Sequence, residues 1–140
     1  MTAMAGLPAD FGYVILTAVA SAFMVGYLAE RVAFARKTHK VEYPTFYSPD
    51  NQLFNCFQRA HGNTLENYPQ FLMFLLLAGI GFPRASSVLG AIWIVSRFSY
   101  AHGYYSGEPG KRMWGVYGYI GLLGLLGLSV TNALRLLEVI

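Results

Sequence analysis

The stretch from Phe57 to Gly79 reads FQRAHGNTLENYPQFLMFLLLAG, and it joins a polar half to an apolar half. The apolar half suits the interior of a bilayer, whereas the polar half carries Arg59, His61 and Glu66. The apolar half alone is short for a membrane span, which needs about 20 residues. We therefore expect a single helix that includes the polar half and places its charged groups near one surface of the membrane.

Composition extends this interpretation to the whole chain. The 140 residues are 55% hydrophobic and 12% charged, about half the charged fraction of a typical soluble domain. Charged residues separate four apolar segments, and a chain of this length suits one domain. We predict an all-α fold, an integral membrane four-helix bundle that forms one domain over residues 1–140, with spans at roughly 10–30, 55–82, 85–105 and 113–134.

Basic residues set the predicted orientation. They gather in the loop after the first span and in the turn before the fourth, at Arg31, Arg36, Lys37, Lys40, Lys111 and Arg112. Because short cytoplasmic loops are enriched in Lys and Arg, we expect both segments to face the cytosol and both termini to lie on the other side. The N-terminal segment lacks the basic region of a secretory signal, so we expect its apolar run to remain as a membrane helix.

Other classes of site are not indicated by the sequence. The net charge of +3 comes without a dense basic tract, so no nucleic-acid partner is expected. The single cysteine, Cys56, excludes an internal disulfide. The histidines His39, His61 and His102 lack the spacing with cysteine or acidic residues that a metal site needs, so no metal is expected.

Helical spacing gathers polar residues on the second span. Arg59, Asn63 and Glu66 fall at i, i+4 and i+7, which is one face of a helix, whereas His61 points elsewhere. Ionisable groups within spans are costly and usually face the protein interior or a wet cavity. The pattern predicts a polar site, with a structural ion pair between Arg59 and Glu66 and a helix-packing role for Asn63 as alternatives.

A second polar face is predicted on the third span, where Arg97, Tyr100 or Ala101, and Tyr104 come together. Both polar faces lie at the helix ends that the basic loops assign to the cytosol, so we expect them to meet at one membrane level. The alternative for the two tyrosines is a place in the aromatic belt of the membrane interface.

The residue types at this level indicate the kind of ligand. Arginines clamp carboxylates in bidentate fashion, and a carboxylate such as Glu66 can hold an ammonium group. The combination of cations, an amide, one acid and tyrosine hydroxyls favours a zwitterionic ligand with more carboxylates than amines. Glutathione has that character, as do other anions, and the residue types alone leave the choice open.

Two segments resemble the MAPEG family, a group of membrane-associated proteins of eicosanoid and glutathione metabolism. They are FNCFQRAHGNTLENYPQFL (residues 54–72) and YAHGYYSGEPGKR (residues 100–112), and the chain most resembles the type 3 microsomal glutathione S-transferases of that family. The resemblance implies a four-helix subunit, a homotrimer, and glutathione bound between neighbouring subunits near the cytosolic face. It also implies the endoplasmic reticulum membrane, with the mitochondrial outer membrane as the alternative.

The resemblance assigns candidate site residues by position. The residues that match the family's glutathione contacts are Arg36, Arg59, His61, Asn63, Glu66, Tyr100 and Tyr104. The family arginine that polarises the thiol matches Arg112, or Lys111 when the chain is counted without a gap from Tyr104. At Asn67 the chain departs from a relative that has tyrosine there.

The activity implied by the resemblance is that of a glutathione transferase and glutathione peroxidase, with leukotriene C4 synthase activity as a further possibility. Such an enzyme activates the glutathione thiolate against lipophilic electrophiles, lipid hydroperoxides or leukotriene A4, with glutathione as co-substrate and membrane lipid as a further partner. The alternative within the superfamily is a non-catalytic lipid-binding scaffold like the lipoxygenase-activating protein. Retention of Arg59, Asn63 and Glu66 favours the enzyme.

Overall fold

The protein folds into helices. A computed structural model describes residues 6–140, so the first five residues of the predicted domain lie outside the described part. Its elements are α1 (Phe11–His39), α2 (Gln52–Gly81), α3 (Pro83–Tyr105), the 3₁₀ helix η1 (Pro109–Gly115) and α4 (Gly118–Leu136). No strand occurs among the described residues, and the all-α prediction is confirmed.

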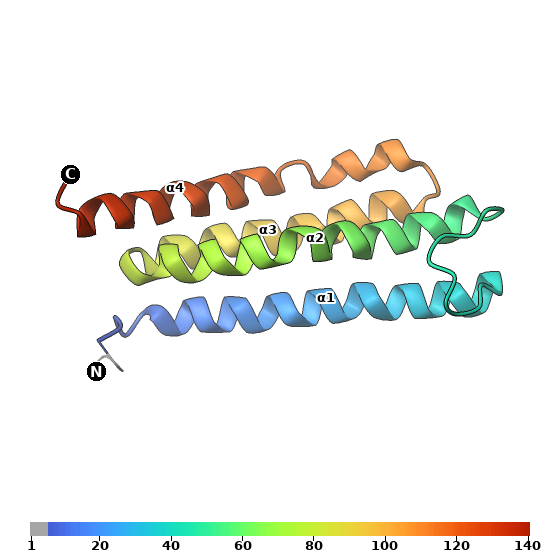
Figure 1. Ribbon diagram of the computed structural model, residues 1–140, viewed down its shortest axis with the longest axis horizontal. Coiled ribbons are helices and arrows are strands. Elements are labelled where there is room, and N and C mark those ends of the chain that lie inside the picture. Colours follow the sequence, from blue (N-terminus) through green and yellow to red (C-terminus); the bar gives the residue numbers. More distant parts are fainter. Residues whose placement is uncertain (1–5) are drawn as a thin grey trace.

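The four α-helices run antiparallel along one long axis (Figure 1). The start of α1 and the C-terminus lie at one end of the bundle, while the loop between α1 and α2 and the segment that contains η1 lie at the other end. Helices α2 and α3 each pack against both α1 and α4. The two basic segments therefore share one end of the molecule, as the expected orientation requires, and the side of the membrane that this end faces stays a prediction.

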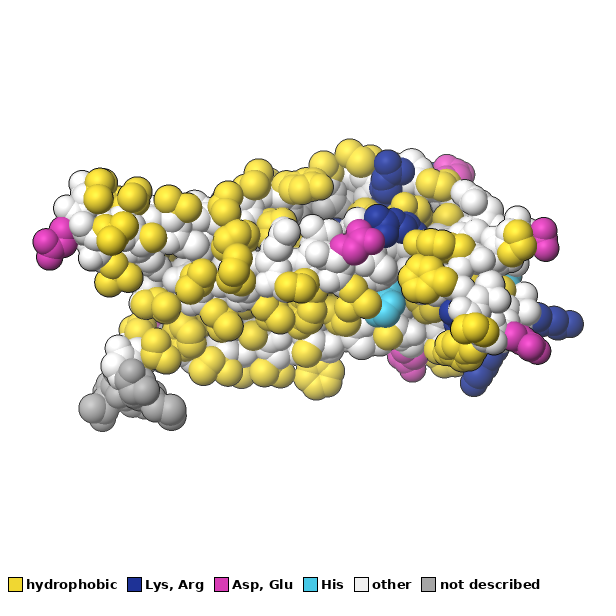
Figure 2. Space-filling view, in the orientation of Figure 1, with side chains coloured by type: hydrophobic (Ala, Val, Ile, Leu, Met, Phe, Trp, Pro, Cys, Tyr) yellow, Lys and Arg dark blue, Asp and Glu magenta, His cyan; other side chains and the backbone are white. Residues whose placement is uncertain are grey.

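The outer surface of the bundle is suited to lipid. Helices α1 and α4 are long and apolar enough to cross a membrane. Large apolar side chains point outward from them, including Phe23 with 77% of its area exposed and Leu123 with 59%. Figure 2 shows hydrophobic side chains over most of the face in view, with Lys and Arg gathered toward the end that holds the long loop. Because exposed apolar surface of this extent is unfavourable in water, the bundle fits a bilayer.

Two helices extend beyond the spans predicted for them. Helix α1 continues past residue 30 to His39, because its last turn is basic and interacts favourably with the exposed carbonyls of a helix C-terminus. Helix α2 begins at Gln52, where the side chain of Asn51 caps the first turn. It then continues through Pro69 without a break, so the polar and apolar halves of the opening stretch belong to one helix.

The segment predicted as the fourth span, residues 113–134, divides into the end of η1 and α4. Close packing on α3 explains the division, because small residues bring the two segments together. A side chain at Gly103 would collide with the carbonyl oxygen of Lys111, and one at Gly118 would collide with the hydroxyl of Ser96. Both glycines thus let η1 and the start of α4 lie directly on α3, and this contact forms one wall of the candidate site.

Candidate functional site

A pocket of about 160 Å³ opens where α2, α3, η1 and α4 meet. Its polar side is formed by Asn63, Asn67, Arg97, Tyr100 and Arg112. Its apolar side is formed by Trp93, Val116, Tyr119 and Leu122, among others. The pocket thus joins cationic groups to a hydrophobic wall within one small space.

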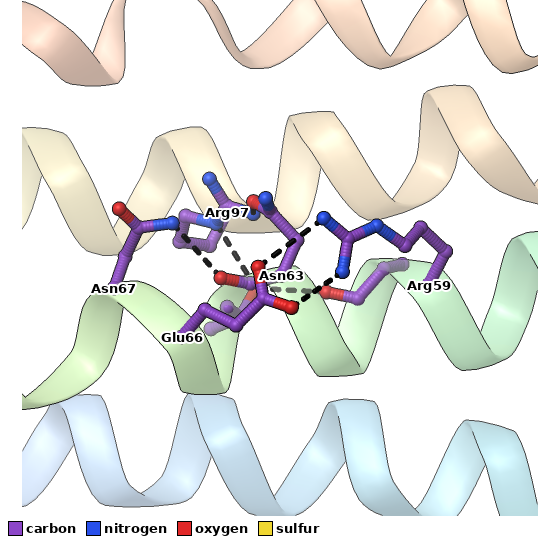
Figure 3. Close-up of polar contacts among 7 residues, drawn as sticks. Arg59, Asn63, Glu66, Asn67 and Arg97 are labelled. Atoms are coloured by element: carbon purple, nitrogen blue, oxygen red, sulfur yellow. Dashed lines mark hydrogen bonds and ion pairs between the residues drawn. The ribbon is translucent and has the colours of Figure 1, made fainter.

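Arg97, which lines the pocket, connects α3 to α2 (Figure 3). Its Nε donates to the Thr64 hydroxyl at 3.0 Å and its Nη2 donates to Oδ1 of Asn63 at 2.7 Å. The guanidinium carbon lies 3.9 Å from the centroid of the Tyr100 ring. Arg97 is 8% exposed and Thr64 is fully buried. These hydrogen bonds and the cation–π contact compensate the cost of removing a cation from water.

The two asparagines present opposite ends of their amides. A guanidinium can only donate, so the atom of Asn63 that faces Arg97 is its oxygen, and its NH₂ group is left for other partners. Asn67 donates from Nδ2 to the backbone carbonyl of Asn63 at 2.9 Å. Because a carbonyl can only accept, the free end of Asn67 is its oxygen. A donor and an acceptor therefore lie one helical turn apart on α2.

Arg59 and Glu66 form a bidentate ion pair on the outer face of α2. The two hydrogen bonds measure 2.7 and 3.2 Å, and the side chains are 37% and 60% exposed. The helical spacing of the sequence predicts this contact, which also satisfies the alternative of a structural pair. Exposed pairs contribute little to stability because water and salt screen them. Arg59 can therefore leave Glu66 for an anionic group of a ligand, and Glu66 can leave Arg59 for a cationic group.

The two candidates for the thiol-polarising residue lie in different surroundings. Arg112 lines the pocket, and its Nη1 donates to the carbonyl of Pro109 at 3.1 Å. Lys111 instead pairs with Glu108, with Nζ 3.3 Å from the carboxylate, and lies over the ring of Trp114 at 5.8 Å. Of the two, only Arg112 borders the pocket within one subunit.

Five predicted ligand contacts do not line this pocket, namely the Arg59–Glu66 pair described above and Arg36, His61 and Tyr104. Arg36, at the end of α1, is buried against the rings of Tyr43 and Phe54, with its guanidinium carbon 4.2 and 5.2 Å from the two centroids. Tyr104 is buried and contacts Tyr100 edge to face at 5.2 Å. His61 is partly buried on another face of α2. The roles of these residues in ligand binding stay predictions.

Tyr104 and Arg59 do share a second, shallower hollow of about 200 Å³, which is bordered by Tyr47, Cys56 and Pro109. Tyr100 lines the main pocket and Tyr104 lines this hollow. Among residues 6–140, no group of three or more His, Cys, Asp or Glu side chains is placed to hold a metal ion.

The sequence places Arg97 on a polar face of the third span but does not identify Asn63 and Thr64 as its hydrogen-bond partners. The available signal was an arginine inside an otherwise apolar span, since such residues usually face a protein interior. Asn67 was noted only as a departure from the family pattern. Its place in the pocket depends on how α2 faces α4, which the sequence does not specify.

The profile of the MAPEG family matches residues 14–134. Among known proteins, the chain is similar to mouse microsomal glutathione S-transferase 2, with 35% identity over 68% of this chain and 64% of that protein. The bovine protein of the same name is 39% identical over 61% and 58% of the two chains. An uncharacterized protein of the cyanobacterium Synechocystis is 35% identical over 72% of each chain.

The matched part thus spans less than two thirds of the two mammalian relatives. Both carry the type 2 name, and the finer resemblance to type 3 stays a prediction. The family profile nevertheless covers α1 from Val14, the whole of α2 and α3, and α4 up to Leu134. On this match, and with the all-α bundle that the family implies, the chain belongs to the MAPEG family.

Proposed function

We propose that this protein is a membrane glutathione transferase that also reduces lipophilic hydroperoxides with glutathione. The observation that carries the proposal is the charge of the pocket, whose lining includes the guanidinium groups of Arg97 and Arg112 and, among the described residues, no carboxylate. Such a pocket favours an anion. Glutathione has two carboxylates and a thiol that can ionise, and the printed names of the mammalian relatives support the same activity.

Glutathione binding uses the donors that the protein leaves free. The NH₂ group of Asn63 and the remaining guanidinium nitrogen of Arg97 are placed to donate to a carboxylate or a peptide carbonyl. At the outer rim, Arg59 and Glu66 separate so that Arg59 takes a carboxylate and Glu66 takes the ammonium group of the ligand. Charge-assisted hydrogen bonds of this kind are about twice as strong as neutral ones.

Arg112 has the role of stabilising the thiolate. The thiolate is the nucleophile, and an unperturbed thiol has a pKa of about 8.5. Lowering that pKa by about two units requires about 2.7 kcal/mol of preferential stabilisation of the anion. A guanidinium in a partly dehydrated pocket supplies an interaction of this size, because charges interact more strongly there than in water. The protein then needs no nucleophile of its own.

In the proposed homotrimer, predicted contacts that lie outside the pocket of one subunit take part in a site shared with a neighbouring subunit. We assign Arg36 and His61 to contacts with glutathione held by a neighbouring subunit of a homotrimer, with Tyr104 closing the site from the side of α3. The exposed apolar faces of α1 and α4 provide surface for both lipid and such subunits. The site then lies near the cytosolic face of the endoplasmic reticulum membrane or of the mitochondrial outer membrane.

The second substrate enters from the bilayer along the apolar side of the pocket. Trp93, Val116 and Leu122 form this side, and the neighbouring surface is apolar. Suitable acceptors are lipophilic electrophiles, epoxides such as leukotriene A4, and lipid hydroperoxides. Conjugation forms a bond from sulfur to carbon, whereas the peroxidase reaction begins with attack of sulfur on oxygen.

A direct assay tests the proposal. Protein purified in detergent is mixed with glutathione and, in separate reactions, an aryl halide, an organic hydroperoxide and leukotriene A4, while glutathione affinity is measured by calorimetry. We expect saturable glutathione binding, a rise in thiolate absorbance on binding, and turnover of at least one acceptor. Absence of saturable binding, or binding without turnover of any acceptor, would favour the lipid-binding scaffold and overturn the proposal.

A further inference from the structure

We propose that Asn67 determines which second substrate the enzyme prefers, by accepting a hydrogen bond from the O–H group of a lipophilic hydroperoxide. This inference rests on the proposed glutathione-dependent function and adds a selecting residue to it. Acceptors without a hydrogen-bond donor, such as aryl halides and epoxides, gain nothing from this contact.

The first step is the orientation of the Asn67 amide. Its nitrogen donates to the backbone carbonyl of Asn63 at 2.9 Å, which fixes which end of the amide is free. An inverted amide would set two oxygens against each other, so the free atom is Oδ1. Figure 3 shows this oxygen pointing away from the bond and toward α3. Among residues 6–140, no donor forms a hydrogen bond with it.

The second step is the position of Asn67 within the pocket. The residue borders the pocket together with Trp93 and Leu122, which belong to its apolar side. It lies one turn beyond Asn63 along α2, in the direction in which the helix becomes wholly apolar. An acceptor without a partner is unfavourable at a partly buried position such as this one. A ligand that brings a donor to this position therefore binds better than one of similar shape that does not.

The third step is the match between this acceptor and the chemistry of a hydroperoxide. In R–O–O–H, the donor hydrogen is attached to the oxygen that the thiolate attacks, so a bond from that hydrogen to Asn67 also orients the reacting atom. The sulfur–oxygen bond forms as the oxygen–oxygen bond breaks, and the alkoxide takes the proton released by the glutathione thiol to give the alcohol. The resulting sulfenic acid then reacts with a second glutathione to give the disulfide and water.

The test compares acceptors in the Asn67→Leu variant, which replaces the amide by an apolar group of similar size. We expect kcat/KM for an organic hydroperoxide such as cumene hydroperoxide to fall about two- to tenfold, the range for one neutral hydrogen bond. Any fall for 1-chloro-2,4-dinitrobenzene, which has no donor hydrogen, should be smaller, so the ratio of the two kcat/KM values should fall. Gln70→Leu is the matched control, because it makes the same change at an exposed position on α2 outside the pocket.

The outcomes separate this inference from the function on which it rests. Equal losses for both acceptors in Asn67→Leu, or no change for either, would overturn the selecting role while turnover by the unmodified protein preserves the proposed function. Lack of turnover by the unmodified protein with both acceptors would overturn both. Asn67→Ala, which cannot overfill the pocket, is measured in parallel and should show the same selective loss. It replaces Asn67→Leu as the test if thermal unfolding shows that the leucine variant is not folded.

Discussion

Replacing Asn63 by aspartate separates the stability of the pocket from its ability to bind an anion. The change keeps the shape of the side chain and leaves an oxygen facing Arg97, whose Nη2 donates to Oδ1 at 2.7 Å. The contact becomes an ion pair, and a hydrogen bond between charged groups stabilises by about 1.5–3 kcal/mol against about 1 for a neutral one. Desolvation of the new carboxylate offsets part of that gain. We expect the free energy of unfolding to stay within about 1 kcal/mol of the original value, or to rise.

Glutathione binding should respond in the opposite direction. Asn63→Asp replaces the free NH₂ group by a second oxygen, so a donor to the ligand becomes a charged acceptor. Loss of one hydrogen bond to a ligand carboxylate costs about 1.5–3 kcal/mol, which is about a 10- to 150-fold increase in Kd. Calorimetry with glutathione and thermal unfolding, both in the same detergent, measure the two effects on one preparation.

Asn67→Asp is a comparison for the added charge, and it also loses the hydrogen bond that Nδ2 donates to the Asn63 carbonyl. It adds the same negative charge one turn along α2, at a residue whose free end is already an oxygen, so it removes no donor from the pocket. We expect a smaller loss of glutathione affinity than in Asn63→Asp. Unchanged affinity in Asn63→Asp, or an equal loss in both variants, would refute the argument that Arg97 orients Asn63 as a donor.

Three further predictions concern the thiolate, the exposed ion pair on α2 and the packing of α4 against α2. Arg112→Ala should abolish the thiolate absorbance that appears when glutathione binds, whereas Lys111→Ala should leave it intact because that side chain pairs with Glu108 outside the pocket; the reverse result in stopped-flow spectra would move the catalytic role to the lysine. Glu66→Gln should weaken glutathione binding by about tenfold or more, since it loses a charged hydrogen bond to the ammonium group; unchanged affinity in calorimetry would make the Arg59–Glu66 pair purely structural. Asn132→Ala should lower the free energy of unfolding of the bundle by about 1 kcal/mol. The Asn132 side chain donates at 2.8 and 3.2 Å to two carbonyls in the last turns of α2. An unchanged thermal unfolding curve would show that water replaces both bonds.

The polar face of α2 could be predicted from the sequence because helical geometry alone determines it. Residues at i and i+7 lie close together on any regular helix, so the Arg59–Glu66 contact needs no knowledge of the neighbouring helices. The contact between Arg97 and Asn63 is of another kind, because the two residues are 34 positions apart. This contact depends on the rotation of α3 about its axis and on its position along that axis relative to α2. Many rotations and positions would have kept both polar faces at the same membrane level.

The η1 segment shows a different limit of sequence reasoning. Residues 113–134 are without charge, and apolar composition does not separate a 3₁₀ turn from the start of an α-helix. The distinction depends on packing, because Gly103 allows the backbone at Lys111 to lie against α3. That contact fixes the path of the chain just before Arg112. The different surroundings of Arg112 and Lys111 could therefore not be predicted from the sequence, in which the two residues are adjacent.

The hydrogen-bond partners of Arg97 explain how an arginine is accommodated inside an otherwise apolar helix. Among the residues described, no carboxylate lines the pocket, and Glu66 is paired with Arg59 on the outer face of α2. Arg97 is buried without an acidic partner within residues 6–140, and its hydrogen bonds go to neutral oxygens. A carboxylate beside Arg97 would make the site more stable when empty and would cancel its attraction for an anion. Neutral partners hold the guanidinium in place, and in the proposed function its charge stays available to the anionic ligand.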